Sequence, residues 1–188
     1  GSGASTSRGF VFDSGIIINN NNGNLIFNGT SENSNGIAFV NNTTVITVAN
    51  ANTSTLFTGQ SNSSSAILLT AGSVVNPNTG SGTTINFTGT SNTSIGTYLA
   101  SATINANGAG NTYLNGCLTS NSSSTGSGLK IDGTSSITNS NGTLSITGNA
   151  NSSQAVYQSG TLTVNHLSGR LFLKGNSDGG IGINLCGT

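Results

Sequence analysis

Charged residues are scarce in this sequence. Only 4% of its 188 residues are charged, whereas about a quarter are charged in an average soluble domain, and four basic residues balance four acidic ones. Without a basic surface to attract phosphate groups, the chain is not expected to bind nucleic acid. Long apolar runs are missing too. None approaches the roughly 18 residues of a membrane-spanning helix, so no transmembrane segment is predicted.

Cysteine, methionine and tryptophan are almost absent. Methionine and tryptophan do not occur, and the two cysteines, Cys117 and Cys186, provide neither a disulfide framework nor a Cys/His cluster. We therefore expect free thiols, no metal site and no cofactor. Good helix formers are also few, because asparagine, serine, threonine and glycine dominate the chain, and this argues against a helical protein.

What the sequence does contain is a repeat. The segment Phe27–Ser31 returns as Phe57–Ser61 and as Phe87–Ser91, and looser copies follow. The central residues of the six copies are spaced 30, 30, 31, 28 and 27 residues apart and are Gly29, Gly59, Gly89, Ser120, Gly148 and Gly175. About seven residues after each of them a second apolar segment opens, and a third short segment completes most units.

Each unit of the repeat predicts three short strands separated by turns. One such unit cannot bury its own apolar side, so the units must stack on one another. The period is too short for the four-stranded blade of a β-propeller, which usually exceeds about 40 residues. The chain is therefore predicted to be all-β, a single parallel β-helix (β-solenoid) of about six three-strand turns of 27–31 residues.

One solenoid accounts for the whole repeat. We interpret residues 9–188 as a solenoid segment cut from a longer filament, because the repeat begins and ends with incomplete units. Residues 1–8 are interpreted as a cloning remnant with an incomplete leading turn. On this interpretation the flanking turns of the parent filament are the immediate partners of the segment.

The two-residue period of a strand sorts side chains into inward and outward positions. In the first strand of each unit we expect an inward stack along the axis, formed by Phe27, Phe57, Phe87, Leu118, Ile146 and Leu173. In the second strand we expect inward pairs at Ile37/Phe39, Ile67/Leu69, Leu129/Ile131 and Ile183/Leu185.

Catalysis on such a solenoid would need paired acids and bases. Carbohydrate-active β-helix enzymes, lyases or hydrolases, use clustered carboxylates, but the four carboxylates here fall in separate units. Asp13 and Asp132 occupy equivalent positions four units apart, which is roughly 20 Å along the axis. His166 has no carboxylate beside it and is interpreted as a solvated turn histidine. We therefore expect no enzymatic activity, with a carbohydrate-active enzyme as the alternative.

Outward positions of the second strand give the best candidates for binding. They form a column in which aromatic and charged residues stand out from serine, threonine and asparagine: Ala38, Leu68, Tyr98, Lys130, Tyr157 and Asn184. Tyrosine is favoured at recognition surfaces because its rigid ring carries a polar tip. Neighbouring outward residues of a first strand add Arg170, Phe172 and Lys174. The alternative is that these aromatic residues only stabilise the sheet.

The pattern Gly-Thr-Ser-x-x-Ser-x-Gly-hydrophobic-x-hydrophobic is clearest at Gly29–Phe39 and Gly89–Leu99, and it resembles the repeats of filamentous haemagglutinin-like exoproteins. The resemblance covers residues 9–187 and implies a right-handed parallel β-helix in a secreted filament on a bacterial cell surface. Such filaments are adhesins or growth-inhibition proteins exported by two-partner secretion. The resemblance implies a role as shaft or as receptor-binding region, with an outer-membrane receptor protein or a surface glycan of another cell as partner. The two cysteines and the irregular copy at Ser120 depart from the family pattern.

An ice-binding solenoid is a third possibility. It is suggested by an outward column of threonines at Thr58, Thr88, Thr119 and Thr147. Asn28 and Lys174 interrupt this column, and no second regular threonine column accompanies it, so we do not favour this function.

Overall fold

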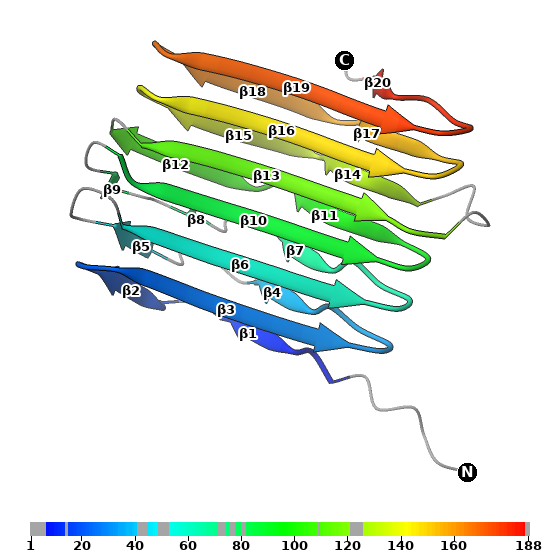
Figure 1. Ribbon diagram of the computed structural model, residues 1–188, viewed down its shortest axis with the longest axis horizontal. Helices are drawn as coiled ribbons and strands as arrows, with labels where there is room; N and C mark the ends of the chain where they lie inside the picture. The colour runs from blue at the N-terminus through cyan, green and yellow to red at the C-terminus, as the bar shows by residue number, and fades with distance from the viewer. Residues whose placement is uncertain are drawn as a thin grey trace.

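The computed structural model describes residues 7–13, 15–40, 45–48, 53–70, 74–75, 78–79, 82–108, 110–120 and 126–186. These residues contain twenty β-strands and no helix (Figure 1). The strands form three parallel sheets stacked along one axis, which confirms the prediction of an all-β parallel β-helix. Residues 1–6 of the interpreted cloning remnant lie outside the described residues.

Each turn of the solenoid contributes one strand to each sheet, except that the turn between β7 (Ile67–Leu69) and β10 (Thr84–Ser91) contributes two short strands, β8 (Val74–Val75) and β9 (Asn78–Thr79), to sheet 3. Sheet 1 lies in front in Figure 1 and consists of β19 (Arg170–Ser177), β16 (Thr143–Ala150), β13 (Asn111–Leu118), β10 (Thr84–Ser91), β6 (Ser54–Ser61) and β3 (Asn24–Ser31). Sheet 2 consists of β1 (Phe10–Phe12), β4 (Ile37–Phe39), β7 (Ile67–Leu69), β11 (Ile95–Ala100), β14 (Ser127–Asp132), β17 (Gln154–Gln158) and β20 (Ile183–Leu185). Sheet 3 consists of β18 (Thr161–His166), β15 (Thr134–Asn139), β12 (Thr103–Gly108), β9 (Asn78–Thr79), β5 (Val45–Val48) and β2 (Ile17–Asn20), with β8 (Val74–Val75) paired to β12.

The coil is right-handed. In Figure 1 the strands of sheet 1 run to the right at the front, those of sheets 2 and 3 return to the left behind them, and each turn lies above the one before. The six strands of sheet 1 enclose about five complete turns, one fewer than predicted from the sequence. The difference arises because the prediction counted each copy of the first strand as a turn, whereas successive copies mark the limits of a turn.

The predicted stack of aromatic rings is present at one end of the core. The ring of Phe57 lies 5.1 Å from that of Phe27 and 5.0 Å from that of Phe87, measured between centroids, with nearly parallel planes. Phe57 and Phe87 are fully buried. Phe12 and Phe39 stack in the same way in sheet 2, with centroids 4.6 Å apart. Like side chains therefore lie over like side chains along the axis, as the repeat predicts.

The register of the fourth turn corrects the sequence prediction. The partner of Phe87 in the next strand is Leu114, not Leu118, and the partner of Gly89 is Gly116, not Ser120. Leu118 is buried, but it packs in a separate cluster with small alanines. Turn lengths follow from the glycines in register and are 30, 30, 27, 32 and 27 residues, between Gly29, Gly59, Gly89, Gly116, Gly148 and Gly175.

The inward pairs of sheet 2 are confirmed along most of the axis. Buried pairs are found at Ile37/Phe39, Ile67/Leu69 and Leu129/Ile131. Ile183 and Leu185 continue the inward positions of Val156 and Gln158 in register, as predicted, but they are exposed because β20 is the last strand of the sheet, with no described strand over it. For the same reason Leu173, on β19, is 43% exposed.

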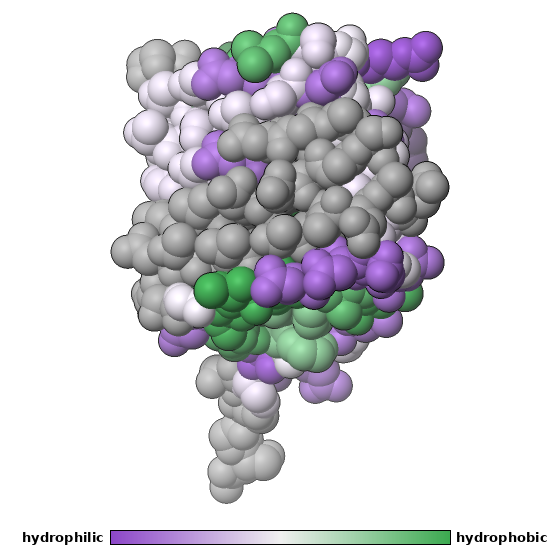
Figure 2. Space-filling view, turned by 90° about the vertical axis from the view of Figure 1, so that its left-hand side faces the viewer, coloured by the Kyte–Doolittle hydropathy of each residue, from purple (hydrophilic) through white to green (hydrophobic). Residues whose placement is uncertain are grey.

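Both ends of the described solenoid show apolar side chains. The end formed by β1, β2 and β3 exposes Phe10, Val11, Ile17 and Ile26. Figure 2 shows apolar side chains gathered at this lower end beneath a band of hydrophilic residues. The other end opens into an apolar cavity of about 250 Å³, lined in part by Leu162, Leu171 and Leu185.

Candidate functional site

The predicted column of outward residues is assembled on the outer face of sheet 2, except that its first member, Ala38, is in register with Leu68 but fully buried. Lys130 pairs in register with Tyr98 on one side and with Tyr157 on the other. Leu68 precedes Tyr98, and Asn184 follows Tyr157. The strand period alone therefore placed these residues correctly relative to one another, since each lies between two inward positions of its strand.

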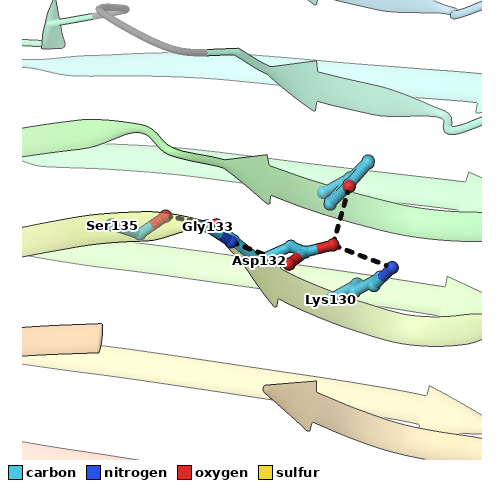
Figure 3. Close-up of polar contacts among 5 residues, drawn as sticks. Lys130, Asp132, Gly133 and Ser135 are labelled. Carbon is cyan, nitrogen blue, oxygen red and sulfur yellow. Dashed lines mark hydrogen bonds and ion pairs between the residues drawn. The ribbon is translucent and has the colours of Figure 1, made fainter. Parts of the chain in front are cut away.

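Lys130 lies between two aromatic rings. Its Nζ atom is 5.2 Å from the centroid of the Tyr98 ring and 5.8 Å from that of the Tyr157 ring, within the range of a cation–π interaction. The same Nζ atom is 3.2 Å from Oδ2 of Asp132. The hydroxyl of Tyr98 donates a hydrogen bond of 3.3 Å to that oxygen. Figure 3 shows Asp132 between Lys130 and Gly133, both of which it contacts.

Asp132 is held in place by the turn that follows β14. Its Oδ1 atom accepts a hydrogen bond of 2.8 Å from the backbone N–H of Gly133, which adopts a φ of 61°, and its carbonyl accepts one of 3.1 Å from the Ser135 hydroxyl. The hydrogen bond from the Gly133 N–H is the main cause that lowers the pKa of the Asp132 carboxyl below its ordinary value, and Lys130 lowers it further. The sequence prediction missed Asp132 as a member of this site, although its position two residues after Lys130 on the same strand marks it as an outward neighbour.

The side chains around Asp132 form a surface without net charge at neutral pH. Burial is the largest cause that raises the pKa of Tyr98, so its phenol stays protonated at neutral pH and remains a hydrogen-bond donor. Lys130 and Asp132 cancel each other's charge. We call the group formed by Leu68, Tyr98, Lys130, Asp132 and Tyr157 the tyrosine face. It offers two half-buried rings and an internally neutralised ion pair on a continuous sheet surface.

The second predicted group lies elsewhere. Arg170, Phe172 and Lys174 are exposed on β19 and therefore belong to sheet 1. Sheets 1 and 2 are separated by a tight corner and face opposite sides in Figure 1. The expectation that these residues neighbour the tyrosine column is thus wrong, because the strand period gives inward or outward direction but not the direction in which each sheet faces.

The acidic residues are distributed as the sequence suggested. Asp13 and Asp132 both directly follow an inward residue of sheet 2, Phe12 and Ile131, and the register separates these two by four turns. Within the described ranges, no three His, Cys, Asp or Glu side chains gather in a way that would hold a metal ion.

Three further sequence predictions concern single residues. His166 is the last residue of β18 and not a turn residue, and its Nδ1 atom lies 3.3 Å from Nδ2 of Asn139. Cys117 and Cys186 are free thiols, as predicted, and burial raises the pKa of the Cys117 thiol. In the threonine column, Asn115 occupies the position predicted for Thr119, which weakens the case for ice binding.

No helix in the described part of the chain is long and apolar enough to cross a membrane. Comparisons with models of protein families, with curated proteins and with solved structures found no match.

Proposed function

We propose that this chain is a non-enzymatic solenoid from a secreted bacterial surface filament, and that its tyrosine face binds a receptor protein on another cell. The observation that carries the proposal is the assembly of Tyr98, Lys130 and Tyr157 in one ladder on an otherwise neutral, polar solenoid. The likeness of the repeat to filamentous haemagglutinin-like sequences supports the setting on a cell surface.

The chemistry of the tyrosine face suits a protein partner better than a glycan. The face is the regular surface of a parallel sheet, and extended surfaces rich in tyrosine are typical of protein–protein contacts. The pairing of Lys130 with Asp132 satisfies both charges within the chain, so a partner need not neutralise either one. Binding should therefore change little with ionic strength, in contrast to electrostatically steered association.

Binding of the purified protein to intact Gram-negative cells tests this proposal. A fluorescent N-terminal fusion is titrated onto a panel of such cells, and bound fluorescence is measured by flow cytometry. The Tyr98→Ala/Tyr157→Ala double variant should bind at least roughly tenfold more weakly, because buried tyrosines often dominate an interface.

Tyr113→Ala provides a matched control. Tyr113 is a half-buried, outward tyrosine on β13 of sheet 1, on the other side of the solenoid, so its loss should leave cell binding unchanged. Equal binding of the double variant and the wild type would eliminate the tyrosine face. If the wild type bound to no cell of the panel, the receptor-binding role would be rejected and the shaft role would remain.

A further inference from the structure

A polar groove follows the corner between sheets 1 and 2, where the strands of sheet 1 end. One hollow of about 360 Å³ spans four turns and is lined by residues that include Glu32, Gln60, Asn62, Thr90 and Asn92. A second hollow of about 470 Å³ shares Thr30, Ser31 and Glu32 with the first and extends to Arg8. The two hollows are therefore parts of one groove that runs along the solenoid axis. Neither contains a residue of the tyrosine face.

Two rows of polar side chains line this corner groove. The first row consists of Thr30, Gln60 and Thr90, which pair in register as outward residues of β3, β6 and β10. The second row consists of the residues that directly follow those strands and the next one: Glu32, Asn62, Asn92 and Thr119. Within each row, successive residues are one strand apart, about 4.8 Å.

Buried serines fix the shape of the groove. The hydroxyls of Ser31, Ser61 and Ser91 accept hydrogen bonds of 3.0, 3.0 and 3.1 Å from backbone N–H groups three residues later. Each of these hydroxyls also donates to a backbone carbonyl of the preceding turn, at 2.7, 2.7 and 2.8 Å. The same two hydrogen bonds therefore hold the corner in three successive turns. A ligand would not have to order these residues, which removes the entropic cost of ordering them from the free energy of binding.

The first row of the groove presents hydrogen-bonding groups that the protein itself does not use. Among the described residues, the side chains of Thr30, Gln60 and Thr90 have no hydrogen-bond partner. In the second row, Thr119 Oγ1 donates to Asn92 Oδ1 at 3.1 Å, and Asn92 Nδ2 donates to Asn62 Oδ1 at 3.5 Å. Amides and hydroxyls can both donate and accept, so the groove matches a ligand whose groups do the same.

The same residues argue against other classes of ligand. The lining residues carry charge only at Arg8 and Glu32, at one end, so the groove does not suit a polyanion. No large apolar side chain lines either hollow, so an apolar peptide anchor finds no pocket. The backbone groups of β6 and β10 are already paired with strands on both sides, so a peptide cannot add as a further strand.

We propose that the corner groove binds a neutral oligosaccharide whose chain lies along the solenoid axis. The hydroxyl groups of successive sugars contact the two rows, and the serine-fixed corner supports them. This site does not rest on the tyrosine face or on the receptor proposed for it.

Calorimetric titration with soluble neutral oligosaccharides tests the proposal. The probes are β-glucan, mannan and chitin fragments of increasing length, with a sulfated series for comparison. At least one neutral series should bind, and its affinity should rise with oligosaccharide length until the groove is filled. Sulfated probes should not bind more tightly than the neutral ones. The Gln60→Ala/Thr90→Ala variant should bind this series roughly tenfold more weakly, because it removes two sets of hydrogen-bonding groups.

Two controls keep the test specific. Thr163→Ala/Asn165→Ala removes an exposed hydroxyl and an exposed amide from β18 of sheet 3 and should leave the affinity unchanged. The Tyr98→Ala/Tyr157→Ala variant should also bind the oligosaccharide normally, which separates this site from the tyrosine face. Circular dichroism establishes that each variant is folded. Failure of every neutral series to bind, binding of sulfated probes only, or full affinity in the Gln60→Ala/Thr90→Ala variant would overturn the proposal.

Discussion

At the scale of single residues, Asp132 does most to shape the tyrosine face. Its carboxylate contacts Lys130 and Tyr98, which come from different strands, and it is anchored by the N–H of Gly133. The two charges of the pair are only partly exposed, with 22% of the Lys130 side chain and 38% of the Asp132 side chain accessible. An ion pair of this kind contributes little to stability, and its main effect is to set the positions of the two side chains.

Asp132→Asn should destabilise the fold slightly and in a pH-dependent way. The pKa of Asp132 is lower in the folded protein than its ordinary value, so its stabilising effect is present above that ordinary pKa and is lost as the pH falls through the folded pKa. At about pH 7 we expect the free energy of unfolding to fall by at most about 1 kcal/mol, and below about pH 3 the difference from the wild type should shrink. Urea denaturation at several pH values measures this.

Asp178→Asn is the matched control for the pH experiment. Asp178 is exposed at the corner after β19, and within the part of the chain that the structure describes its hydrogen bond runs from the backbone N–H to the carbonyl of Ala150 in the preceding turn. We expect its substitution to leave the stability unchanged at neutral pH. A loss of stability in Asp132→Asn that is the same at neutral and acid pH would show that the carboxylate charge has no part in the effect.

At the scale of the strand, a column of glycines at the end of sheet 1 lets each strand pass close to the next sheet. A Cβ atom on Gly89 would lie 2.0 Å from the carbonyl oxygen of Gly96, and one on Gly148 would lie 1.8 Å from that of Ala155. Both obstacles are backbone atoms, which cannot rotate out of the way. Only glycine therefore fits these positions, for reasons of space and not of backbone conformation.

Gly89→Ala should consequently destabilise the protein by more than about 2 kcal/mol, because the corner must open to admit the methyl group. Gly179→Ala is the matched control, since a Cβ there would lie no closer than 3.7 Å to any atom outside its immediate neighbours. Chemical denaturation measures both variants. If Gly89→Ala is as stable as Gly179→Ala, the close approach at the corner is not a constraint.

The glycine column also explains which turns could be placed in register from the sequence and which could not. The regular turns around Phe27, Phe57 and Phe87 were predictable, because two apolar patterns kept the same spacing. The fourth turn was misplaced because Leu118–Ser122 resembles the repeat, yet Ser120 carries a Cβ that the corner position excludes, and Gly116 takes that position instead.

Features that depend on how sheets and corners are arranged were beyond the sequence pattern. The period of two separates inward from outward residues, but it does not give the angle between sheets, so the separation of Phe172 from the tyrosine face was not predictable. The corner groove was missed for a related reason. Its rows are ordinary threonines and amides in the sequence, and only the stacking of turns brings them together.

At the scale of the whole molecule, strand pairing in the described part of the chain joins each turn only to the turns next to it. Stability is then close to a sum of turn and interface contributions along one axis. The central strands β10 and β13 have a paired strand on each side, whereas β19 and β20 end their sheets and carry the exposed Leu171, Leu173 and Leu185. Local opening should therefore cost least at the ends and most in the centre.

Native-state hydrogen exchange, followed by mass spectrometry, tests this one-dimensional behaviour. Backbone amides of β10 and β13 should exchange most slowly, and those of β1, β19 and β20 fastest. The Ile146→Ala variant gives a sharper test of the same behaviour, because it disturbs one position in the core. Ile146 is 2% exposed in β16, which pairs with β13 and β19. The cavity it leaves should cost about 2–5 kcal/mol locally, so exchange should quicken in β13, β16 and β19 far more than in β3. Equal acceleration in β3 and β19 would instead mean that the solenoid opens as one cooperative unit and that its turns do not act as separate neighbours.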